Sequence, residues 1–231
     1  MPTLLNYLSP MLKSFLSLWL KFPCPLCQRT AENTICKYCQ KKLASYQLSQ
    51  PQASWIGDLP IFAWGKYDGE LSRAMAKIKY DNHPELGVLF GNWLGKSWLK
   101  SCPISPQQKL LILPIPLYKE KLKTRGFNQA ESMARGFCQI TKHSLETKGL
   151  IRIKDTKAMF GLNPIQRQKN IEGAFQVSHT WQKNPPQSPV LLLDDIYTRG
   201  TTVKEAALVL QQHNIKVLGA IAIAKAIKTK I

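Results

Sequence analysis

Two adjacent aspartates, Asp194 and Asp195, follow directly on the apolar run VLLL at residues 190 to 193. Neighbouring carboxylates repel each other, so a ligand or cation that compensates their charge is expected where they meet. A ribose diol suits the pair, because ionised carboxylates accept hydrogen bonds from both hydroxyls. The same oxygens can support Mg²⁺ bound to a pyrophosphate. The pair therefore predicts a site for a sugar phosphate.

The loop TRGTT at 198 to 202 adds the features of a phosphate site. Thr202 and Glu205 match the capping box S/T-x-x-E, which predicts that a helix begins here. A helix N-terminus offers free N–H groups and the positive end of its dipole to a phosphate, and Gly200 lets the backbone come close. The residues expected to bind the ligand are Asp194, Asp195, Thr198, Arg199, Gly200, Thr201 and Thr202.

The alternative interpretation is an aspartate pair that only caps turns at a strand end. The full combination of apolar strand, aspartate pair, hydroxyl-rich glycine loop and helix start argues against it. The sequence contains neither the phosphate-loop pattern G-x-x-x-x-G-K-[ST] nor the dinucleotide pattern G-x-G-x-x-G. Their absence argues against an NTPase and against a Rossmann-type dinucleotide-binding protein.

Four cysteines form two C-x-x-C pairs, CPLC at 24 to 27 and CKYC at 36 to 39. Each such turn directs two sulfurs to one point, and two turns complete a tetrahedral zinc site. The residues expected to bind a structural Zn²⁺ are Cys24, Cys27, Cys36 and Cys39. A redox C-x-x-C needs only one pair, and disulfides need an oxidising compartment, so both are weaker interpretations.

The composition is strongly basic, with 32 Lys and Arg against 14 Asp and Glu and a formal net charge of +18. Such a charge predicts attraction to polyanions: nucleic acid, phosphorylated metabolites or anionic lipid. The basic residues are dispersed, which favours a patch on a folded surface over a disordered arm. With 231 residues, 44% of them apolar, the chain can form one ordinary domain plus a small module.

Residues 1 to 21 are expected to form an amphipathic helix, because apolar residues from Leu4 to Trp19 recur on one helical face. No stretch is apolar enough to span a bilayer, and the segment lacks the basic region and cleavage site of a signal peptide. We therefore expect a cytoplasmic protein. The helix packs on the rest of the chain in the simplest interpretation, and docks on a partner or a membrane in the alternative.

The polar, proline-containing residues 45 to 60 predict a linker, so we expect a zinc module with its linker at 22 to 60 and a main domain at 61 to 231. The periodicity predicts strands at 61–67, 109–117, 149–153, 174–177, 190–193 and 216–226, helices at 70–80, 84–99, 127–142 and 203–213, and a long loop at 154–173. Strands that alternate with helices indicate an α/β fold with a mainly parallel sheet flanked by helices.

Three stretches together resemble a known family. The run VLLLDDIYTRGTT at 190 to 202 resembles the phosphoribosyl-diphosphate (PRPP) motif of type I phosphoribosyltransferases. The run PIPLYKEKLKTRGFNQA at 114 to 130 is similar to the signature of the ComF family. Residues 151 to 175 resemble that family's second signature, through Gly161, Leu162, Arg167, Asn170 and Phe175, with Met159 where the family usually has Gln. The C-x-x-C turns also fit, so the resemblance covers about residues 22 to 226.

The resemblance implies a phosphoribosyltransferase-like domain with a hood over its ligand. It implies that Asp194 and Asp195 hold the ribose, that the loop at 198 to 202 holds the 5′-phosphate, and that the loop after the strand at 110 to 113 takes the pyrophosphate. Arg125 is the candidate catalytic residue, closing over the pyrophosphate with a bidentate guanidinium. A plain surface arginine is the alternative.

Lys77 and Lys79 lie near the site by the same resemblance, although a solvated helix face explains them equally well.

The motifs and the resemblance are compatible with three functions. The resemblance favours a competence protein that acts in DNA uptake and natural transformation, with single-stranded DNA and uptake proteins as partners. The second is an active phosphoribosyltransferase that uses PRPP·Mg²⁺, for which the sequence shows no recognisable acceptor pocket. The third is a regulator that binds PRPP without turnover. The sequence leaves turnover open.

Overall fold

The structure is a computed structural model that describes residues 22–105, 107–156 and 163–227. The chain divides into two compact units, Met1–Ser45 and Tyr46–Ile231. The amphipathic helix expected at 1–21 lies outside the described residues. Of the helices in the described part of the chain, none has the length and apolar character needed to cross a membrane.

The small unit contains a short antiparallel pair, β1 (Phe22–Pro23) and β2 (Thr30–Ala31), followed by α2 (Lys37–Ala44). The first C-x-x-C lies in the turn between the two strands. The second begins at the N-terminus of α2, where Cys36 is the N-cap residue. One cysteine pair is therefore positioned by a hairpin and the other by a helix start.

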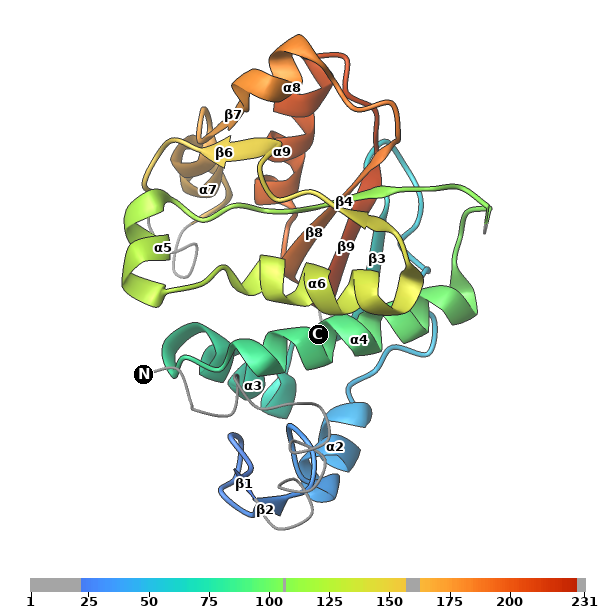
Figure 1. The fold of residues 1–231 in the computed structure, drawn as a ribbon, viewed down its shortest axis with the longest axis vertical. Coiled ribbons are helices and arrows are strands. Elements are labelled where there is room, and N and C mark those ends of the chain that lie inside the picture. Colours follow the sequence, from blue (N-terminus) through green and yellow to red (C-terminus); the bar gives the residue numbers. More distant parts are fainter. Residues whose placement is uncertain (1–21, 106, 157–162, 228–231) are drawn as a thin grey trace, which may run out of the picture. The chain divides into compact units, whose positions relative to one another are not determined.

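The large unit is built on a five-stranded sheet in the order β3-β9-β8-β4-β5, in which every pairing is parallel (Figure 1). Its strands are β3 (Ile61–Lys66), β4 (Leu111–Pro114), β5 (Ser144–Leu145), β8 (Val190–Tyr197) and β9 (Val217–Lys225). Parallel strands covered on both faces are apolar throughout, which explains the run VLLL. The expected α/β class with a parallel sheet is confirmed.

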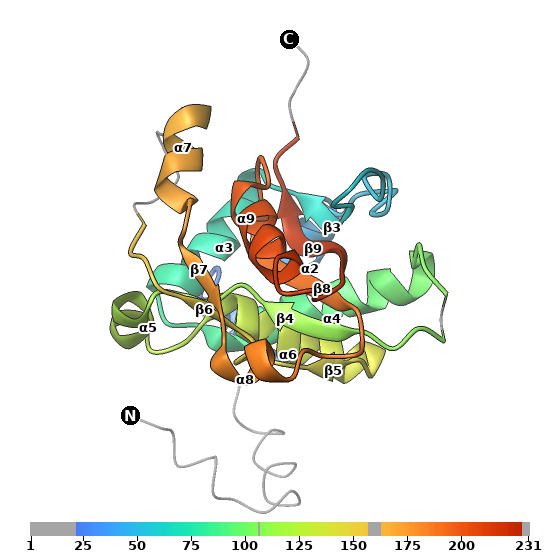
Figure 2. The ribbon, with the colours of Figure 1, turned by 90° about the horizontal axis from the view of Figure 1, so that it is seen from above.

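Helices cover both faces of the sheet (Figures 1 and 2). On one face lie α3 (Gly69–Tyr80), α4 (Pro84–Ser101) and α6 (Gln129–Thr141), and on the other lies α9 (Thr201–Gln211). The side chains of α9 pack with Leu113 and Leu192 in one buried cluster. Since residues alternate between the faces of a strand, the neighbouring Ile112 and Leu191 face the opposite helical layer.

Helices α4 and α6 approach each other closely because glycines line their contact. A Cβ on Gly91 would lie 2.0 Å from the backbone oxygen of Met133, and a Cβ on Gly136 would lie 2.1 Å from that of Val88. No side chain fits at these distances. The helix pair is therefore held backbone to backbone, and α6 forms a firm support for the strand ends that it packs against.

Of the linker expected at 45–60, residues 46–60 belong to the large unit. Gln47 and Ser54 form antiparallel bridges with Gly65 and Ile61. β3 is an edge strand, and an edge exposes backbone groups that must be satisfied. The polar segment supplies those partners, so it covers the edge of the sheet.

A separate antiparallel pair, β6 (Leu150–Arg152) and β7 (Phe175–Val177), stands beside the sheet with α7 (Pro164–Ile171) between its strands. The expectation of a loop at 154–173 is thus wrong for its second half. Asn163 and Gln166 each accept a hydrogen bond from the other's backbone N–H at 2.9 Å. This reciprocal cap starts α7.

The described part of the large unit also contains two shorter helices, α5 (Lys119–Arg125) and α8 (His179–Lys183).

Candidate functional site

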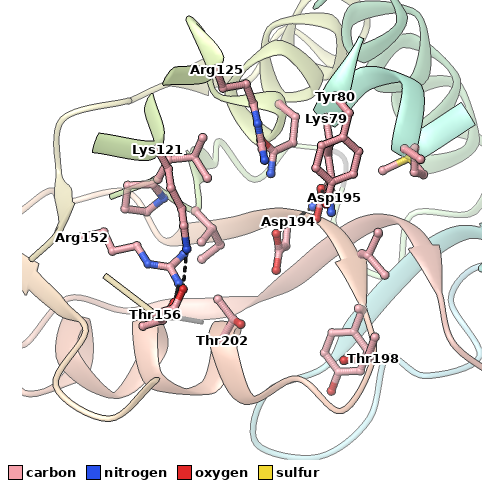
Figure 3. A pocket seen from close by; sticks show the side chains of 18 of the residues that line it. Lys79, Tyr80, Lys121, Arg125, Arg152, Thr156, Asp194, Asp195, Thr198 and Thr202 are labelled. Atoms are coloured by element: carbon pink, nitrogen blue, oxygen red, sulfur yellow. Dashed lines mark hydrogen bonds and ion pairs between the residues drawn. The ribbon is translucent and has the colours of Figure 1, made fainter. Parts of the chain in front are cut away.

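A cavity of about 1300 Å³ lies at the carboxyl ends of β4 and β8. This is the edge where open parallel sheets bind their ligands. Figure 3 shows charged side chains entering it from several elements. The polar residues that line it include Lys79, Glu120, Lys121, Lys123, Arg125, Gln129, Arg152, Asp155, Thr156, Asp194, Asp195, Thr198, Thr201 and Thr202.

The aspartate pair lies within β8, close to its carboxyl end, and an ammonium group from α3 contacts it. Lys79 Nζ is 2.7 Å from Asp195 Oδ2, and both side chains are largely buried. Asp194 Oδ1 accepts a hydrogen bond from the backbone N–H of Asp195 at 2.8 Å. Lys77, two residues earlier on α3, pairs instead with the exposed Asp81. Of these two lysines, the structure brings Lys79 to the site.

The two carboxyl groups have opposite pKa shifts. Burial and the neighbouring charge of Asp195 raise the pKa of Asp194 to about 7. Burial also acts on Asp195, but the attraction of Lys79 and a hydrogen bond from Gln129 outweigh it and lower its pKa. The pKa of Lys79 is raised, since Asp195 overcomes the effect of burial. Around neutral pH, Asp195 and Lys79 are therefore an ion pair, while Asp194 titrates.

Gln129 connects the aspartate pair to Arg125. The Arg125 guanidinium donates a hydrogen bond to Gln129 Oε1, and the Gln129 side chain hydrogen-bonds to Asp195. Asn128 fixes the start of α6, because its Oδ1 accepts from the N–H of Ala130 at 3.1 Å. Its Nδ2 donates to the carbonyl of Ile115 at 3.0 Å. The loop after β4 and the helix that carries Gln129 are thus joined.

The loop after β8 leads into α9 differently from the sequence prediction. Gly200 is the N-cap residue, with φ of 75°, and no side chain caps the helix. The predicted capping box of Thr202 and Glu205 is therefore wrong. Glu205 is buried, and it accepts a hydrogen bond from the N–H of Gly173 at 2.8 Å. The start of α9 lies at the cavity, since Gly200, Thr201 and Thr202 line it, as a phosphate site at a helix N-terminus requires.

The opposite wall is basic and comes from the separate hairpin and from α5. Arg152 of β6 donates to the hydroxyl of Thr156, and Lys121 of α5 donates to the carbonyl of the same residue (Figure 3). Lys121 also lies 2.9 Å from Asp155 Oδ1. Burial lowers the pKa of Arg152, and the charges of Asp194 and Asp155 act against this effect. The cavity thus has the aspartate pair with Lys79 on one side, and Arg152 and Lys121 with Asp155 on the other.

The structure brings most of the predicted ligand-binding residues into one cavity. Those that line it are Arg125, Asp194, Asp195, Thr198, Gly200, Thr201 and Thr202, whereas Arg199 is exposed and does not line it. Gly161 and Leu162 of the second signature, and Met159, lie outside the described residues. Sequence reasoning missed Gln129 and Arg152 as cavity residues. Gln129 stood within the RGFNQ signature, and that signal was available.

A second site is formed by the cysteines of the small unit. The Sγ atoms of Cys24, Cys27, Cys36 and Cys39 all lie within 4.8 Å of one another. None of these residues forms a disulfide. The N–H of Cys24 donates to the carbonyl of Arg29 at 2.7 Å, and the N–H of Gln28 donates to that of Cys24 at 2.8 Å, which folds the first turn tightly.

The donor set of this cluster suits a tetrahedral metal. Four thiolates are a typical structural zinc set, and their site leaves no open position for a substrate. A hydrogen bond from the backbone of Cys39 lowers the pKa of Cys36 to about 7, so a thiolate forms readily at the helix start. The arrangement can bind a metal such as Zn²⁺, and it ties the hairpin to α2.

The sequence is similar to proteins that are named for competence or for DNA utilization. The chain is 25% identical to competence protein F of Haemophilus influenzae, covering 80% of this chain and 88% of that protein. It is 24% identical to competence protein ComFC of Bacillus subtilis, covering 80% and 69%, and 22% identical to DNA utilization protein YhgH of Escherichia coli O157:H7, covering 82% and 84%. No family model matches the chain.

Proposed function

The chain belongs to the ComF family, and we propose that it acts on DNA in competence and binds a PRPP-type sugar phosphate in the cavity of its large unit. Similarity to two proteins named for competence and to one named for DNA utilization supports the first half of the proposal. The net charge of +18 supports a polyanionic partner, for which single-stranded DNA is the choice.

The observation that carries the ligand proposal is that Asp194 and the start of α9 line one cavity. A carboxylate that titrates near neutrality can accept hydrogen bonds from ribose hydroxyls. The N–H groups at the start of α9, at Thr201 and Thr202, can bind the 5′-phosphate, and Gly200 leaves room for it because it has no side chain. A sugar 5-phosphate with free 2′- and 3′-hydroxyls satisfies both ends.

The basic wall accounts for the remaining charge of PRPP. Arg125 and Lys123 lie at the end of α5, beside the loop that follows β4. A pyrophosphate there meets guanidinium and ammonium groups, and Mg²⁺ bound to its oxygens neutralises further charge. We assign Arg125 the clamp on the pyrophosphate. Its hydrogen bond to Gln129 couples that clamp to the aspartate pair.

The proposal concerns binding of PRPP, and it leaves open whether the protein also transfers the phosphoribosyl group. Isothermal titration with PRPP·Mg²⁺ and with single-stranded DNA, each at two salt concentrations, tests both halves. Saturable PRPP binding and DNA binding that weakens steeply with salt are expected. A flat titration with PRPP·Mg²⁺ rejects the ligand, and absence of DNA binding at low salt rejects the partner.

For the small unit we propose a structural zinc held by Cys24, Cys27, Cys36 and Cys39. The proximity of the four sulfurs supports it. Zinc supplies the cross-link that so short a segment needs to fold. Elemental analysis of the purified protein, expected to give one zinc per chain, is the test.

A further inference from the structure

Lys79 gives the aspartate pair a cation of its own. Its ammonium is 2.7 Å from Asp195 Oδ2, and the two side chains are 22% and 7% exposed. Among the described residues, Oδ2 is a buried oxygen without a hydrogen bond of good geometry, so the ammonium is its compensating contact. Leaving such an oxygen uncompensated is costly.

The two aspartates have different surroundings. Asp195 is contacted by Lys79 from α3 and by the side chain of Gln129 from α6. The hydrogen bond found for the Asp194 carboxylate among the described residues comes from the adjacent backbone N–H of Asp195. The Asp194 side chain points into the cavity (Figure 3). Asp195 is therefore fixed by two helices, whereas Asp194 is directed at the ligand.

We propose that Lys79 is a positioning residue that neutralises and orients Asp195 before any ligand arrives, so that the pair receives sugar hydroxyls and not a free divalent cation. Mg²⁺ then enters the cavity on the phosphates of the ligand. The inference rests on the proposed function for the identity of that ligand. The ion pair and its effect on free Mg²⁺ do not depend on it.

Charge explains why Mg²⁺ is kept away. Two ionised carboxylates and one ammonium sum to −1, against −2 for the carboxylates alone. Ca²⁺ and Mg²⁺ sites draw on several anionic or neutral oxygens, and here an ammonium occupies the position beside Asp195 where a divalent cation would contact it. A dication at that position repels Lys79 as well as the guanidinium of Arg152, whose charge reaches Asp194.

The test compares Lys79→Met with the matched control Lys77→Met. Both substitutions remove one ammonium from α3, but Lys77 pairs with Asp81 at the surface. In thermal melts without PRPP, we expect Lys79→Met to lower Tm by roughly 5 °C and Lys77→Met to change it little. Millimolar MgCl₂ should raise the Tm of Lys79→Met and leave the wild type and Lys77→Met unchanged. Lys79→Arg, which keeps the charge, should stay insensitive to MgCl₂.

A wild-type melt that rises with MgCl₂ alone overturns the proposal, and so does a Lys79→Met melt that ignores it. A double-mutant cycle with Asp195→Asn adds a readout that simple packing does not move. Asp195→Asn should cost much less stability in the Lys79→Met background than in the wild type. Additive effects mean that Lys79 only packs, which rejects the positioning role.

If Lys79→Met does not fold, the double variant Lys79→Met/Asp195→Asn carries the test, since it removes both charges. A folded double variant supports the ion pair, and one that stays unfolded rejects it. Failure of PRPP·Mg²⁺ to bind the wild type counts against the proposed function alone. A wild-type melt that responds to MgCl₂ counts against the role of Lys79 alone.

Discussion

The carboxylate of Glu205 accepts a hydrogen bond from the backbone N–H of Gly173 at 2.8 Å. Glu205 lies on α9, one turn after the helix start that faces the cavity, and is 7% exposed. Gly173 lies just before β7 and has φ of 64°, a conformation that favours glycine. The bond therefore ties α9 to the hairpin that carries Arg152.

Glu205→Ala should destabilise the large unit by about 1–3 kcal/mol, because it leaves the N–H of Gly173 without its partner. For a chain of this size, that lowers Tm by roughly 2–4 °C per kcal/mol. Glu205→Gln keeps an oxygen acceptor and should lose less. Lys204→Ala, an exposed neighbour on the same helix, is the control for helix propensity. Equal melting of Glu205→Ala and Lys204→Ala would show that the bond contributes nothing.

Cys24→Ser should abolish metal binding and unfold the small unit, while the large unit keeps its structure. The reason is that a structural Cys₄ zinc supplies much of the folding free energy of a short module. Elemental analysis and limited proteolysis measure the two effects, and we expect new cleavage between residues 22 and 45. Cys102→Ser is the matched control, because Cys102 belongs to the large unit and is not part of the cluster.

Native zinc content below one per chain, or a Cys24→Ser protein that keeps its metal, contradicts this prediction. A Cys24→Ser protein in which both units unfold also contradicts it, since the small and large units form separate compact bodies.

The sheet was predictable because buried parallel strands leave a simple record in the sequence. The run VLLL is apolar at every position, since helices cover both faces of β8. The sequence analysis did not predict helix α7, because the apolar periodicity of this segment is weak. Its start was nevertheless predictable, because Asn163 and Gln166 have the spacing of a capping box and Pro164 is the first helical residue.

The resemblance placed both Lys77 and Lys79 near the site, but the sequence did not show which of them pairs with the aspartates. Lys79 is 116 residues away from Asp195 in sequence (195 − 79), and only the packing of α3 beside the sheet joins them. The helical periodicity that predicts Ile78 to be buried does not single out Lys79 as a residue of the site. Similarly, Thr202 and Glu205 have the spacing of a cap, but a buried backbone N–H from Gly173 competes for the same carboxylate. Local sequence patterns predict contacts between residues that are close in sequence. The Lys79–Asp195 and Gly173–Glu205 contacts both join residues that are far apart in sequence.

The affinity for PRPP should rise between pH 6 and pH 8, because the pKa of Asp194 is raised to about 7 and its ionised form accepts the ribose hydrogen bonds. The ionised fraction of a group with that pKa increases roughly tenfold over this range. Without ligand the sign is opposite. The native state holds the Asp194 proton more tightly than the unfolded state, so stability falls as pH rises from about 4 to 7.

Titration calorimetry at several pH values measures the first effect. The phosphates of the ligand lose protons near pH 6 as well, so Asp194→Asn provides the background. The expected result is a steeper pH dependence for the wild type than for Asp194→Asn. Parallel profiles for the two proteins place the titrating group on the ligand and not on Asp194.

The single variants Asp194→Asn and Asp195→Asn should separate binding from stability. Asp194→Asn removes the carboxylate that points into the cavity and relieves its repulsion with Asp195, so stability without ligand should hold or rise. Its loss of one charge-assisted hydrogen bond, about 1.5–3 kcal/mol, should weaken PRPP binding about 10- to 150-fold. Asp195→Asn leaves the largely buried ammonium of Lys79 without its counter-charge, so its Tm should fall. Thermal melts and titrations of both variants give the comparison. If the aspartate pair only caps turns, both variants should lose stability to the same extent, and neither should change the response to PRPP·Mg²⁺.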